Sequence, residues 1–389
     1  MEKHGVTILV LLDLSSAFDT IDHKVLLSRL QDLIGCSDIP LKWFTSYLAG
    51  RSQRVCIDGK FSSTQFLRFG VPQGSVLGPL LFLVYTLPLG NIIRGYGLAL
   101  HIYADDTQIY ASICPTTDGV NLAVSTIENC VSDIQNWMLR NFLKLNAEKT
   151  EVIVCGFRAQ LNKFHLPSVN IAGVNVPVQV NAVRNLGVMF DCNMSMSAQV
   201  TKVVRAANYH LVNIGRARKM LTTESTKAAV HSLVTSQIDY CNSLLAGISE
   251  TLLKRLVNIQ RTAARIVTRK RKYDPISSDL LELHWLPIKQ RIAFKILVIV
   301  YKCLHQTAPD YLSELLHVST SRRNLRSTST TSVILTEHRT QRSTFADRSF
   351  SCYGPKLWNA LPNHIKSASS IDIFKKLLKQ HLFYIAYNQ

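Results

Sequence analysis

The stretch "IYADDTQIY", residues 102–110, places two adjacent carboxylates, Asp105 and Asp106, inside a segment with the composition of a buried β-strand. Ile102 and Tyr103 on one side, and Ile109 and Tyr110 on the other, give both arms strand character. The aspartates are therefore predicted at the tip of a tight hairpin. Like charges held so close repel each other, and a bound cation would explain why the chain keeps them there.

A third carboxylate, Asp13, lies near the end of the apolar run "VTILVLLDL", residues 6–14. This run has no polar alternation, a pattern typical of a strand covered on both faces. If the strand neighbours the hairpin in one sheet, Asp13 lies beside Asp105 and Asp106. Three carboxylate ligands favour Mg²⁺, with Mn²⁺ as an alternative. Two such ions would support phosphoryl transfer by in-line displacement.

Composition points to a folded protein with a polyanionic partner. The 389 residues are 47% hydrophobic, enough for a substantial core. Lysine and arginine total 44 against 26 acidic residues, which gives a formal net charge of +18. The basic residues cluster, notably in segments 254–272 and 321–332, and this clustering favours a surface that follows nucleic-acid phosphates. Charge alone leaves a merely basic protein as an open alternative.

The cysteines and the apolar segments argue against zinc and against a membrane span. Nine cysteines occur without a C-x-x-C pair or a histidine at zinc-ligand spacing, so no zinc site is expected. They are interpreted as reduced residues of an intracellular protein. The apolar segment 78–93 is too short and too interrupted by prolines to cross a bilayer, so no membrane segment is expected.

The order of predicted elements indicates an α+β domain followed by a helical one. Strands are predicted over 6–14, 98–113 and 150–156, with hairpins at Asp58-Gly59 and over 183–191. Helices are predicted over 23–33, 40–48, 200–217, 222–245, 251–269 and 287–305. Two further helices are predicted, one that begins at 78 and one that follows the strands of 98–113 and ends near 141. The predicted domains are 1–192 (α+β), 193–318 (helical), 319–351 (a basic Ser/Thr/Arg-rich linker) and 352–389 (a small C-terminal cap).

Three motifs in this order resemble motifs A, B and C of reverse transcriptases: "LLDLSSAFDTIDH", "GVPQGSVLGPLLFLVY" and "YADD". More narrowly they resemble the polymerase of LINE-type (non-LTR) retrotransposons of the jockey-like group. "LKLNAEKTEVIVCG" and "VRNLGVMFD" resemble motifs D and E, so the resemblance covers residues 6–191. It implies a reverse-transcriptase palm, an antiparallel sheet with helices on one face, followed by an all-helical thumb region.

The resemblance also implies roles for individual residues. Asp13, Asp105 and Asp106 match the family's catalytic metal-binding triad. Lys149 matches the motif D lysine that assists the departing pyrophosphate as a general acid, although a solvated surface lysine remains an alternative. Phe18 matches the aromatic steric gate against the ribose 2′-hydroxyl, the alternative being a core phenylalanine.

Two further pairs of residues match nucleic-acid-binding positions of the family. Gln73 and Gly74 match the motif B loop that approaches the template base and the incoming nucleotide, and glycine there lets the backbone come near. Leu186 and Gly187 match the hairpin that grips the primer end, although packing would also account for both. The implied partners are an RNA template, a DNA primer and deoxynucleoside triphosphates, and the implied location is a cytoplasmic ribonucleoprotein and the nucleus.

One departure from the family pattern leaves two functions open. Motif A begins almost at Met1, whereas family polymerases place fingers, and often an endonuclease, before it. We therefore expect a truncated copy of an RNA-directed DNA polymerase, lacking the N-terminal endonuclease and fingers, with weak or no activity alone. The alternative is a non-catalytic RNA-binding remnant, which would not need magnesium to bind its partner. The oligomeric state is left open.

Overall fold

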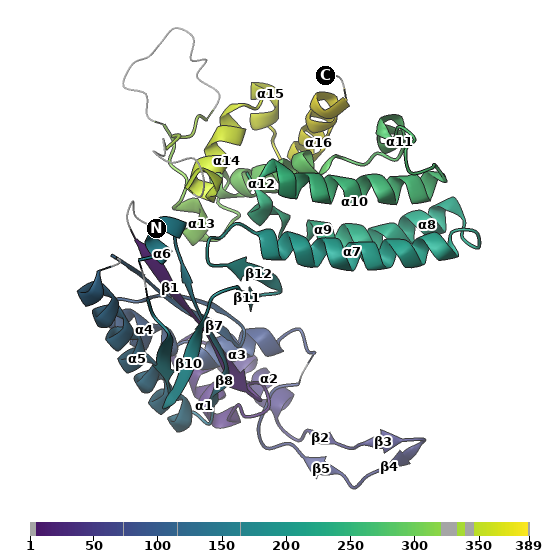
Figure 1. The fold of residues 1–389 in the computed structure, drawn as a ribbon. Helices are drawn as coiled ribbons and strands as arrows, with labels where there is room; N and C mark the ends of the chain where they lie inside the picture. The colour runs from purple at the N-terminus through teal and green to yellow at the C-terminus, as the bar shows by residue number, and fades with distance from the viewer. Residues whose placement is uncertain are drawn as a thin grey trace. The chain divides into compact units, whose positions relative to one another are not determined.

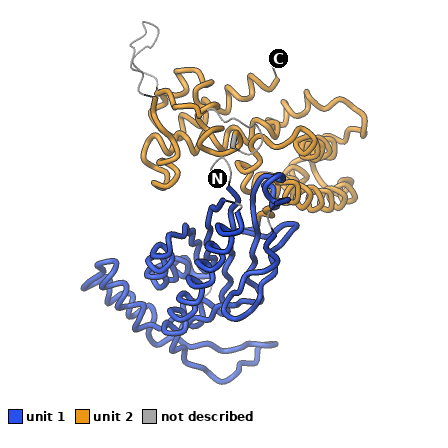
Figure 2. Tube along the Cα trace, turned by 60° about the vertical axis from the view of Figure 1, so that its left-hand side comes forward, with its two compact units in different colours: residues 1–187, 191–194 blue, residues 188–190, 195–389 orange. Residues whose placement is uncertain are grey.

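A computed structural model describes residues 5–72, 74–114, 116–163, 165–319, 333–338 and 346–387. The chain divides into two compact units, shown in different colours in Figure 2. Unit 1 comprises Met1–Gly187 with Asp191–Met194, and unit 2 comprises Val188–Phe190 with Ser195–Gln389. Among the described residues, no helix combines the length and the apolar character needed to cross a membrane.

Unit 1 is built on a six-stranded sheet with the strand order β6-β7-β1-β8-β10-β9. Neighbouring strands are antiparallel except β8 and β10, which run parallel, so the expected antiparallel sheet holds for all but one pair. The β9–β10 hairpin was not predicted. The strand bounds are β1 (Val6–Ser15), β6 (Ala99–Tyr103), β7 (Asp106–Ile113), β8 (Lys144–Cys155), β9 (Ser168–Ile171) and β10 (Val174–Gln179).

Strand β1 lies in the middle of this sheet, hydrogen-bonded to β7 on one side and β8 on the other. Alternate side chains, Val6, Ile8, Val10 and Leu12, are at most 2% exposed. The residues between them are only half-buried. The expectation that both faces are fully covered was therefore wrong, because one face is closed by the core and the other only partly. The central position in the sheet accounts for the missing polar alternation.

Helices pack on the sheet of unit 1 and supply the rest of its core (Figure 1). The predicted apolar stripe of α5, Ile127, Val131, Ile134 and Met138, is completely buried. Pro79 lies in the first turn of α3, as expected from its position. The helix bounds are α1 (His23–Asp32), α2 (Asp38–Leu48), α3 (Gly78–Thr86), α4 (Leu89–Gly95), α5 (Thr117–Arg140) and α6 (Arg158–Leu161).

A narrow β-arm extends from unit 1 between α2 and α3 (Figure 1). Its strands are β2 (Ser52–Gln53), β3 (Cys56–Ile57), β4 (Lys60–Phe61) and β5 (Gln65–Phe66), and all of their residues are exposed. Asp58 and Gly59, with φ of 48° and 77°, form the tight turn between β3 and β4. The predicted Asp-Gly hairpin is therefore confirmed.

Unit 2 is almost entirely helical, as predicted. The expected helix over 222–245 is interrupted by a π-helical turn at His231–Thr235, and Cys241 in a left-handed conformation ends it. The bounds of the longer elements are α7 (Ser197–Ala217), α8 (Thr223–Val230), α10 (Glu250–Thr268), α12 (Ile288–Leu304), α14 (Phe350–Asn359) and α16 (Ile371–Tyr387). The shorter ones are α9 (Ser236–Asp239), α11 (Ser277–Glu282), α13 (Asp310–Ser313) and α15 (Asn363–Lys366).

The C-terminal helices share one hydrophobic core with the rest of unit 2. Trp358 of α14 and Phe374 of α16 are at most 1% exposed and belong to the same cluster as the buried residues of α7, α10 and α12. The Phe374 ring stacks on Tyr301 of α12 with 4.3 Å between ring centroids. Most of the segment 319–351, predicted as a linker, lies outside the described residues.

Candidate functional site

The pairing of β1 with β7 brings three carboxylates to the same end of these two strands in unit 1. Leu12 pairs with Thr107 in the antiparallel ladder, so Asp13, which follows Leu12, adjoins Asp106, which precedes Thr107. Asp105 lies in the turn that joins β6 to β7. The two strands are thus neighbours in one sheet, as the carboxylate pattern required.

The turn that presents Asp105 is a tight two-residue connection. Tyr103 pairs with Asp106, which leaves Ala104 and Asp105 between the strands. Ala104 has φ of 54°, a left-handed conformation that costs free energy for a residue with a Cβ. The β6–β7 ladder on either side holds this turn in place. Asp105 is consequently fixed relative to β7 rather than carried on a long loop.

Electrostatics at this edge favour a bound cation. The pKa of the Asp106 carboxyl is raised by partial burial, then by the charges of Asp105 and Asp13. Within the described part of the chain, no three acidic, histidine or cysteine side chains are already gathered closely enough to hold a metal ion. The chemistry of the set nevertheless fits Mg²⁺, because all of its donors are carboxylate oxygens and a cation would relieve their repulsion.

A bulge in β8 borders the carboxylates on the other side of β1. Leu11 pairs with Glu151 but Asp13 pairs with Asn146, so residues 147–150 of β8 stand opposite a single residue of β1. The Thr150 hydroxyl donates to the Asn146 carbonyl at 2.9 Å and accepts from the Asp13 amide at 3.4 Å. Bulges of this kind redirect side chains next to functional sites. No sequence signal identified this one.

Lys149 lies within this bulge and is exposed. Its backbone N–H donates to the side-chain carbonyl of Asn146 at 3.3 Å, which fixes the local conformation. Because Asn146 is the pairing partner of Asp13, the bulge lies beside the end of β1 that carries Asp13. The catalytic role of Lys149 stays a prediction.

Gly70 and Val71, just before α3, are hydrogen-bonded to the loop that follows β1, and we call this contact the clamp. The Gly70 amide donates to the Ile21 carbonyl at 2.8 Å, and the Val71 amide donates to the Phe18 carbonyl at 2.9 Å. The Gly70 carbonyl in turn accepts from Nε2 of His23 at 2.8 Å. These bonds join the predicted motif B to the predicted motif A, and sequence reasoning had identified neither Gly70 nor His23 as important.

Gly70 occupies a position in this clamp that leaves no room for a side chain. Its φ is 88°, and an added Cβ would lie 3.0 Å from the carbonyl oxygens of Phe18 and Asp19. We expect Gly70→Ala to lower the free energy of unfolding by about 1–3 kcal/mol, because both strain and a backbone clash result. Gly74→Ala is the matched control: Gly74 also has positive φ, but a Cβ added there would have no atom within 4 Å. Urea titrations that give equal costs for the two variants would contradict the clamp.

Phe18 is half-buried and packs against α3. Its ring lies 5.2 Å from that of Phe82, which is 1% exposed. Gln73 lies outside the described residues. Gly74 is exposed, with φ of 78° and open space around it, so a ligand could approach its backbone without obstruction. Asp22 accepts from the Val25 amide and caps α1.

Leu186 and Gly187 form the turn between β11 (Ala182–Asn185) and β12 (Val188–Asp191), with φ of 45° and 82°. Asn185, just before this turn, exchanges two side-chain hydrogen bonds with Gln108 of β7, at 2.8 and 3.1 Å. Gln108 follows Asp106 by two residues, so this amide pair ties the turn to the carboxylate-bearing strand. Sequence reasoning missed both amides, and only the folded structure makes them partners.

Comparisons with known proteins find a matching family and several similar proteins. Residues 1–190 match the family described as reverse transcriptase (RNA-dependent DNA polymerase). The chain is 28% identical over 274 residues to "Probable RNA-directed DNA polymerase from transposon BS" of Drosophila melanogaster. It is 25% identical over 267 residues to "RNA-directed DNA polymerase from mobile element jockey" of Drosophila funebris. These matches cover 67% and 66% of this chain but 28% of each relative, so the chain spans little more than a quarter of their length.

A comparison of folds gives apo telomerase from Candida tropicalis, with 10% identity and a TM-score of 0.37, over 75% of this chain and 47% of that one. At that score the likeness supports no argument about this chain. The family match covers residues 1–190, which include the three carboxylates. This chain therefore contains, in residues 1–190, a domain of the reverse transcriptase family, similar to the polymerases of LINE-type (non-LTR) retrotransposons such as jockey.

Proposed function

We propose that this chain is the polymerase domain of a non-LTR retrotransposon. It performs RNA-directed DNA synthesis where the C-terminal end of β1 meets the N-terminal end of β7. The observation that supports this most directly is the pairing of β1 with β7, which sets Asp13 beside Asp106 in a reverse-transcriptase-family domain. The proposed substrates are an RNA template, a DNA primer and deoxynucleoside triphosphates. By the same family argument, the chain would work in a ribonucleoprotein and in the nucleus.

The carboxylates would hold the divalent ions that this chemistry uses. Asp13, Asp105 and Asp106 would hold Mg²⁺, or Mn²⁺, through their oxygens. When bound, such ions would activate the primer 3′-hydroxyl as a nucleophile and neutralise negative charge on the triphosphate. The protein's own contribution is positioning: the β6–β7 turn fixes Asp105, the ladder fixes Asp106, and the bulge in β8 holds the amide of Asp13.

The remaining residues have proposed roles around this centre. Lys149, exposed in the bulge, would deliver a proton to the departing pyrophosphate. Gln73 and Gly74 would lie against the template base and the incoming nucleotide. Leu186 and Gly187, tied to β7 through Asn185 and Gln108, would support the primer end.

Phe18 is proposed to discriminate between deoxyribose and ribose. Replacing Phe18 with valine removes the ring that would crowd a 2′-hydroxyl, so we expect ribonucleotide incorporation relative to deoxyribonucleotide incorporation to rise about tenfold or more. The ratio of the two rates in one preparation is the measurement, because it does not depend on the folded fraction. The core variant Phe82→Val should lower both rates together. An unchanged ratio in Phe18→Val would assign Phe18 to packing alone.

Primer extension by the purified chain on an RNA template tests the proposed function itself. The expected product is DNA, formed at a low rate with Mg²⁺ or Mn²⁺ and not in a chelator. If no DNA is formed with either ion, or if synthesis survives substitution of Asp105, the catalytic proposal fails. A chain that instead binds RNA without any need for a divalent ion would support the non-catalytic alternative.

A further inference from the structure

Unit 2 contains a cavity of about 390 Å³ beside α12, which we call the α12 cavity. Its walls come from α9, the 3₁₀ turn Asn242–Leu245, the segment between α11 and α12, α12 itself and α16. A volume of this order is within the range of small-molecule sites in proteins. The lining residues that decide its chemistry are Asp239, Asn242, Arg291, Phe294, Lys295 and Lys379.

Two of the charges in the α12 cavity neutralise each other. Arg291 donates to the Asp239 carboxylate from Nε, at 2.9 Å, and from Nη2, so the two side chains form an ion pair with two hydrogen bonds. The same carboxylate accepts from Nδ2 of Asn242 at 3.3 Å. The fold therefore accounts for Asp239, for Arg291 and for the nitrogen end of the Asn242 amide.

The oxygen end of the Asn242 amide has no such explanation. Asn242 is 5% exposed, and its Oδ1 is buried without a hydrogen-bond partner among the residues that the structure describes. The bond from Nδ2 to Asp239 fixes which end of the amide is the oxygen, so the unpaired atom is an acceptor. A buried acceptor without a donor costs free energy, which an incoming hydroxyl group would recover.

Lys295 and Lys379 supply positive charge that the ion pairs of the fold do not use. Both are exposed, and neither takes part in the ion pairs formed by described residues. Lys295 follows Arg291 by four residues and lies on the same face of α12, whereas Lys379 belongs to α16. Two ammonium groups on different helices suit an occupant with more than one anionic group.

The walls of the α12 cavity are joined to each other by contacts of the fold. The Tyr387 hydroxyl of α16 donates to the Trp285 carbonyl at 2.6 Å, which ties α16 to the segment before α12. The Phe383 ring lies 6.4 Å from the ring of His284 in that segment, and 5.8 Å from Nζ of Lys379. Because these contacts position the wall that carries Lys379, little ordering is required when a ligand binds.

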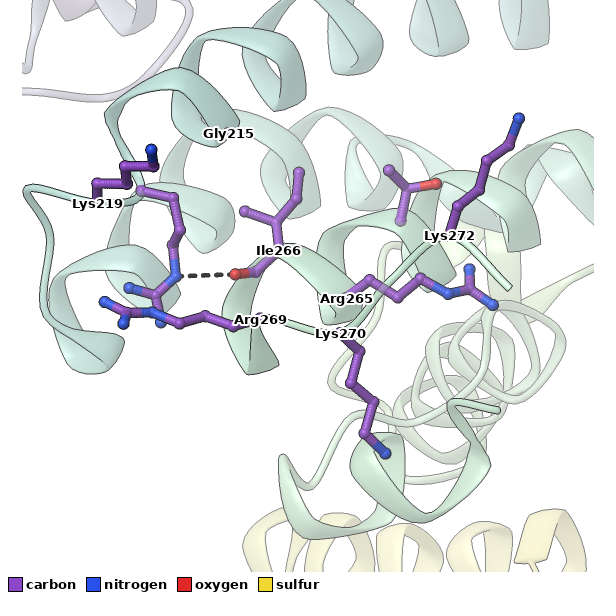
Figure 3. A pocket seen from close by; sticks show the side chains of 9 residues that line it. Gly215, Lys219, Arg265, Ile266, Arg269, Lys270 and Lys272 are labelled. Atoms are coloured by element: carbon purple, nitrogen blue, oxygen red, sulfur yellow. Dashed lines mark hydrogen bonds between the residues drawn. The ribbon is translucent and has the colours of Figure 1, made fainter. Parts of the chain in front are cut away.

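Another cavity of unit 2, at the C-terminal ends of α7 and α10, has a different composition (Figure 3). Every charged residue that lines it is a lysine or an arginine, a set suited to an extended polyanion. The α12 cavity instead includes the Asp239 carboxylate, and its guanidinium, the group that best fits phosphate, is already bound to that carboxylate. The carboxylates of a small molecule therefore fit the α12 cavity better than the phosphates of a nucleic acid.

We propose that the α12 cavity is a binding site for a small organic polycarboxylate that also carries a hydroxyl group. Lys295 and Lys379 bind its carboxylates, Oδ1 of Asn242 accepts from its hydroxyl group, and the Phe294 ring packs against its carbon skeleton. The site lies wholly within unit 2 and shares no residue with the three carboxylates of unit 1. It therefore stands whether or not the chain synthesises DNA.

Citrate and tricarballylate are the probes, because they carry the same three carboxylates and differ only in the hydroxyl group of citrate. Titration calorimetry of the purified full chain, at neutral pH and constant ionic strength without divalent ions, measures the affinity for each. We expect saturable binding of citrate, about five- to tenfold tighter than that of tricarballylate. The reason is that only citrate supplies the donor that Oδ1 of Asn242 lacks.

Substitution of the two lysines locates the binding. Lys295→Gln and Lys379→Gln should each weaken citrate binding at least about threefold, because each removes one opposite charge. Lys289→Gln of α12 and Lys376→Gln of α16 are the matched controls, since both residues are exposed and neither is among the described residues that line the α12 cavity. The controls should change the affinity less than about twofold.

Four outcomes would overturn the proposal: no saturable citrate binding, equal affinities for citrate and tricarballylate, equal effects of the cavity variants and their controls, or displacement of citrate by a 20-nucleotide RNA. The last of these would assign the cavity to nucleic acid. Asp105→Asn should leave citrate binding unchanged, so this result does not depend on the polymerase assignment.

Discussion

Replacing Asp105 with asparagine is expected to reduce DNA synthesis about 10²–10³-fold, a loss comparable with removal of one group that stabilises developing charge in other enzymes. Asparagine keeps the size of the side chain but lacks the charge that binds a cation. The β6–β7 turn should persist, because its ladder pairs backbone atoms of Tyr103 and Asp106. The loss should therefore appear in the rate of primer extension and not in the amount of folded protein.

Asp19→Asn is the matched control for this experiment. Asp19 is exposed and follows Asp13 by six residues, so the change removes an equal charge from the same loop region. Its rate should stay within about threefold of the unmodified chain. A thermal-shift series adds a second readout: Mg²⁺ or Mn²⁺ should raise the melting temperature of the Asp19 variant more than that of Asp105→Asn. Equal rates for the two variants would exclude Asp105 from the reaction.

Replacing Trp358 with alanine is expected to destabilise unit 2 by about 3–5 kcal/mol, the range for large aromatic residues removed from a core. Trp358 is 1% exposed, its ring lies 6.0 Å from that of Phe374, and its Nε1 donates to the Val333 carbonyl at 3.0 Å. The truncation leaves both a cavity and an unpaired carbonyl. Amide hydrogen exchange is the appropriate measurement, because it reports the two units separately.

Trp43→Ala controls for the loss of a tryptophan as such. Trp43 of α2 is 52% exposed, and its ring contacts those of Phe44 and Tyr47, at 5.1 and 5.3 Å between ring centroids. Its removal should cost less than about 1 kcal/mol and affect exchange in unit 1 only. If Trp358→Ala accelerates exchange only in α14 and α16 and leaves α12 protected, the C-terminal helices do not share a cooperative core with the rest of unit 2.

Local patterns in the sequence were sufficient for most elements. The apolar stripe of α5, the proline at the start of α3 and the Asp-Gly turn of the β-arm each identify an element through interactions within a few residues. The β9–β10 hairpin was missed although its Ala172-Gly173 turn has positive φ at both residues. Its parallel pairing with β8 depends on a strand far away in the sequence, which no local pattern reports.

The candidate site, like the fold, was predictable in part from local sequence patterns. Contiguous residues were enough to identify the three carboxylates and the strands that carry them, because motif order and apolar flanks are read along the chain. The folded chain adds that Asp13 adjoins Asp106, that Gly70 must lack a side chain, and that Asn185 binds Gln108. These three facts involve residues 51 to 93 positions apart in the chain, and strand register and backbone contact over such separations are set by packing of the whole unit.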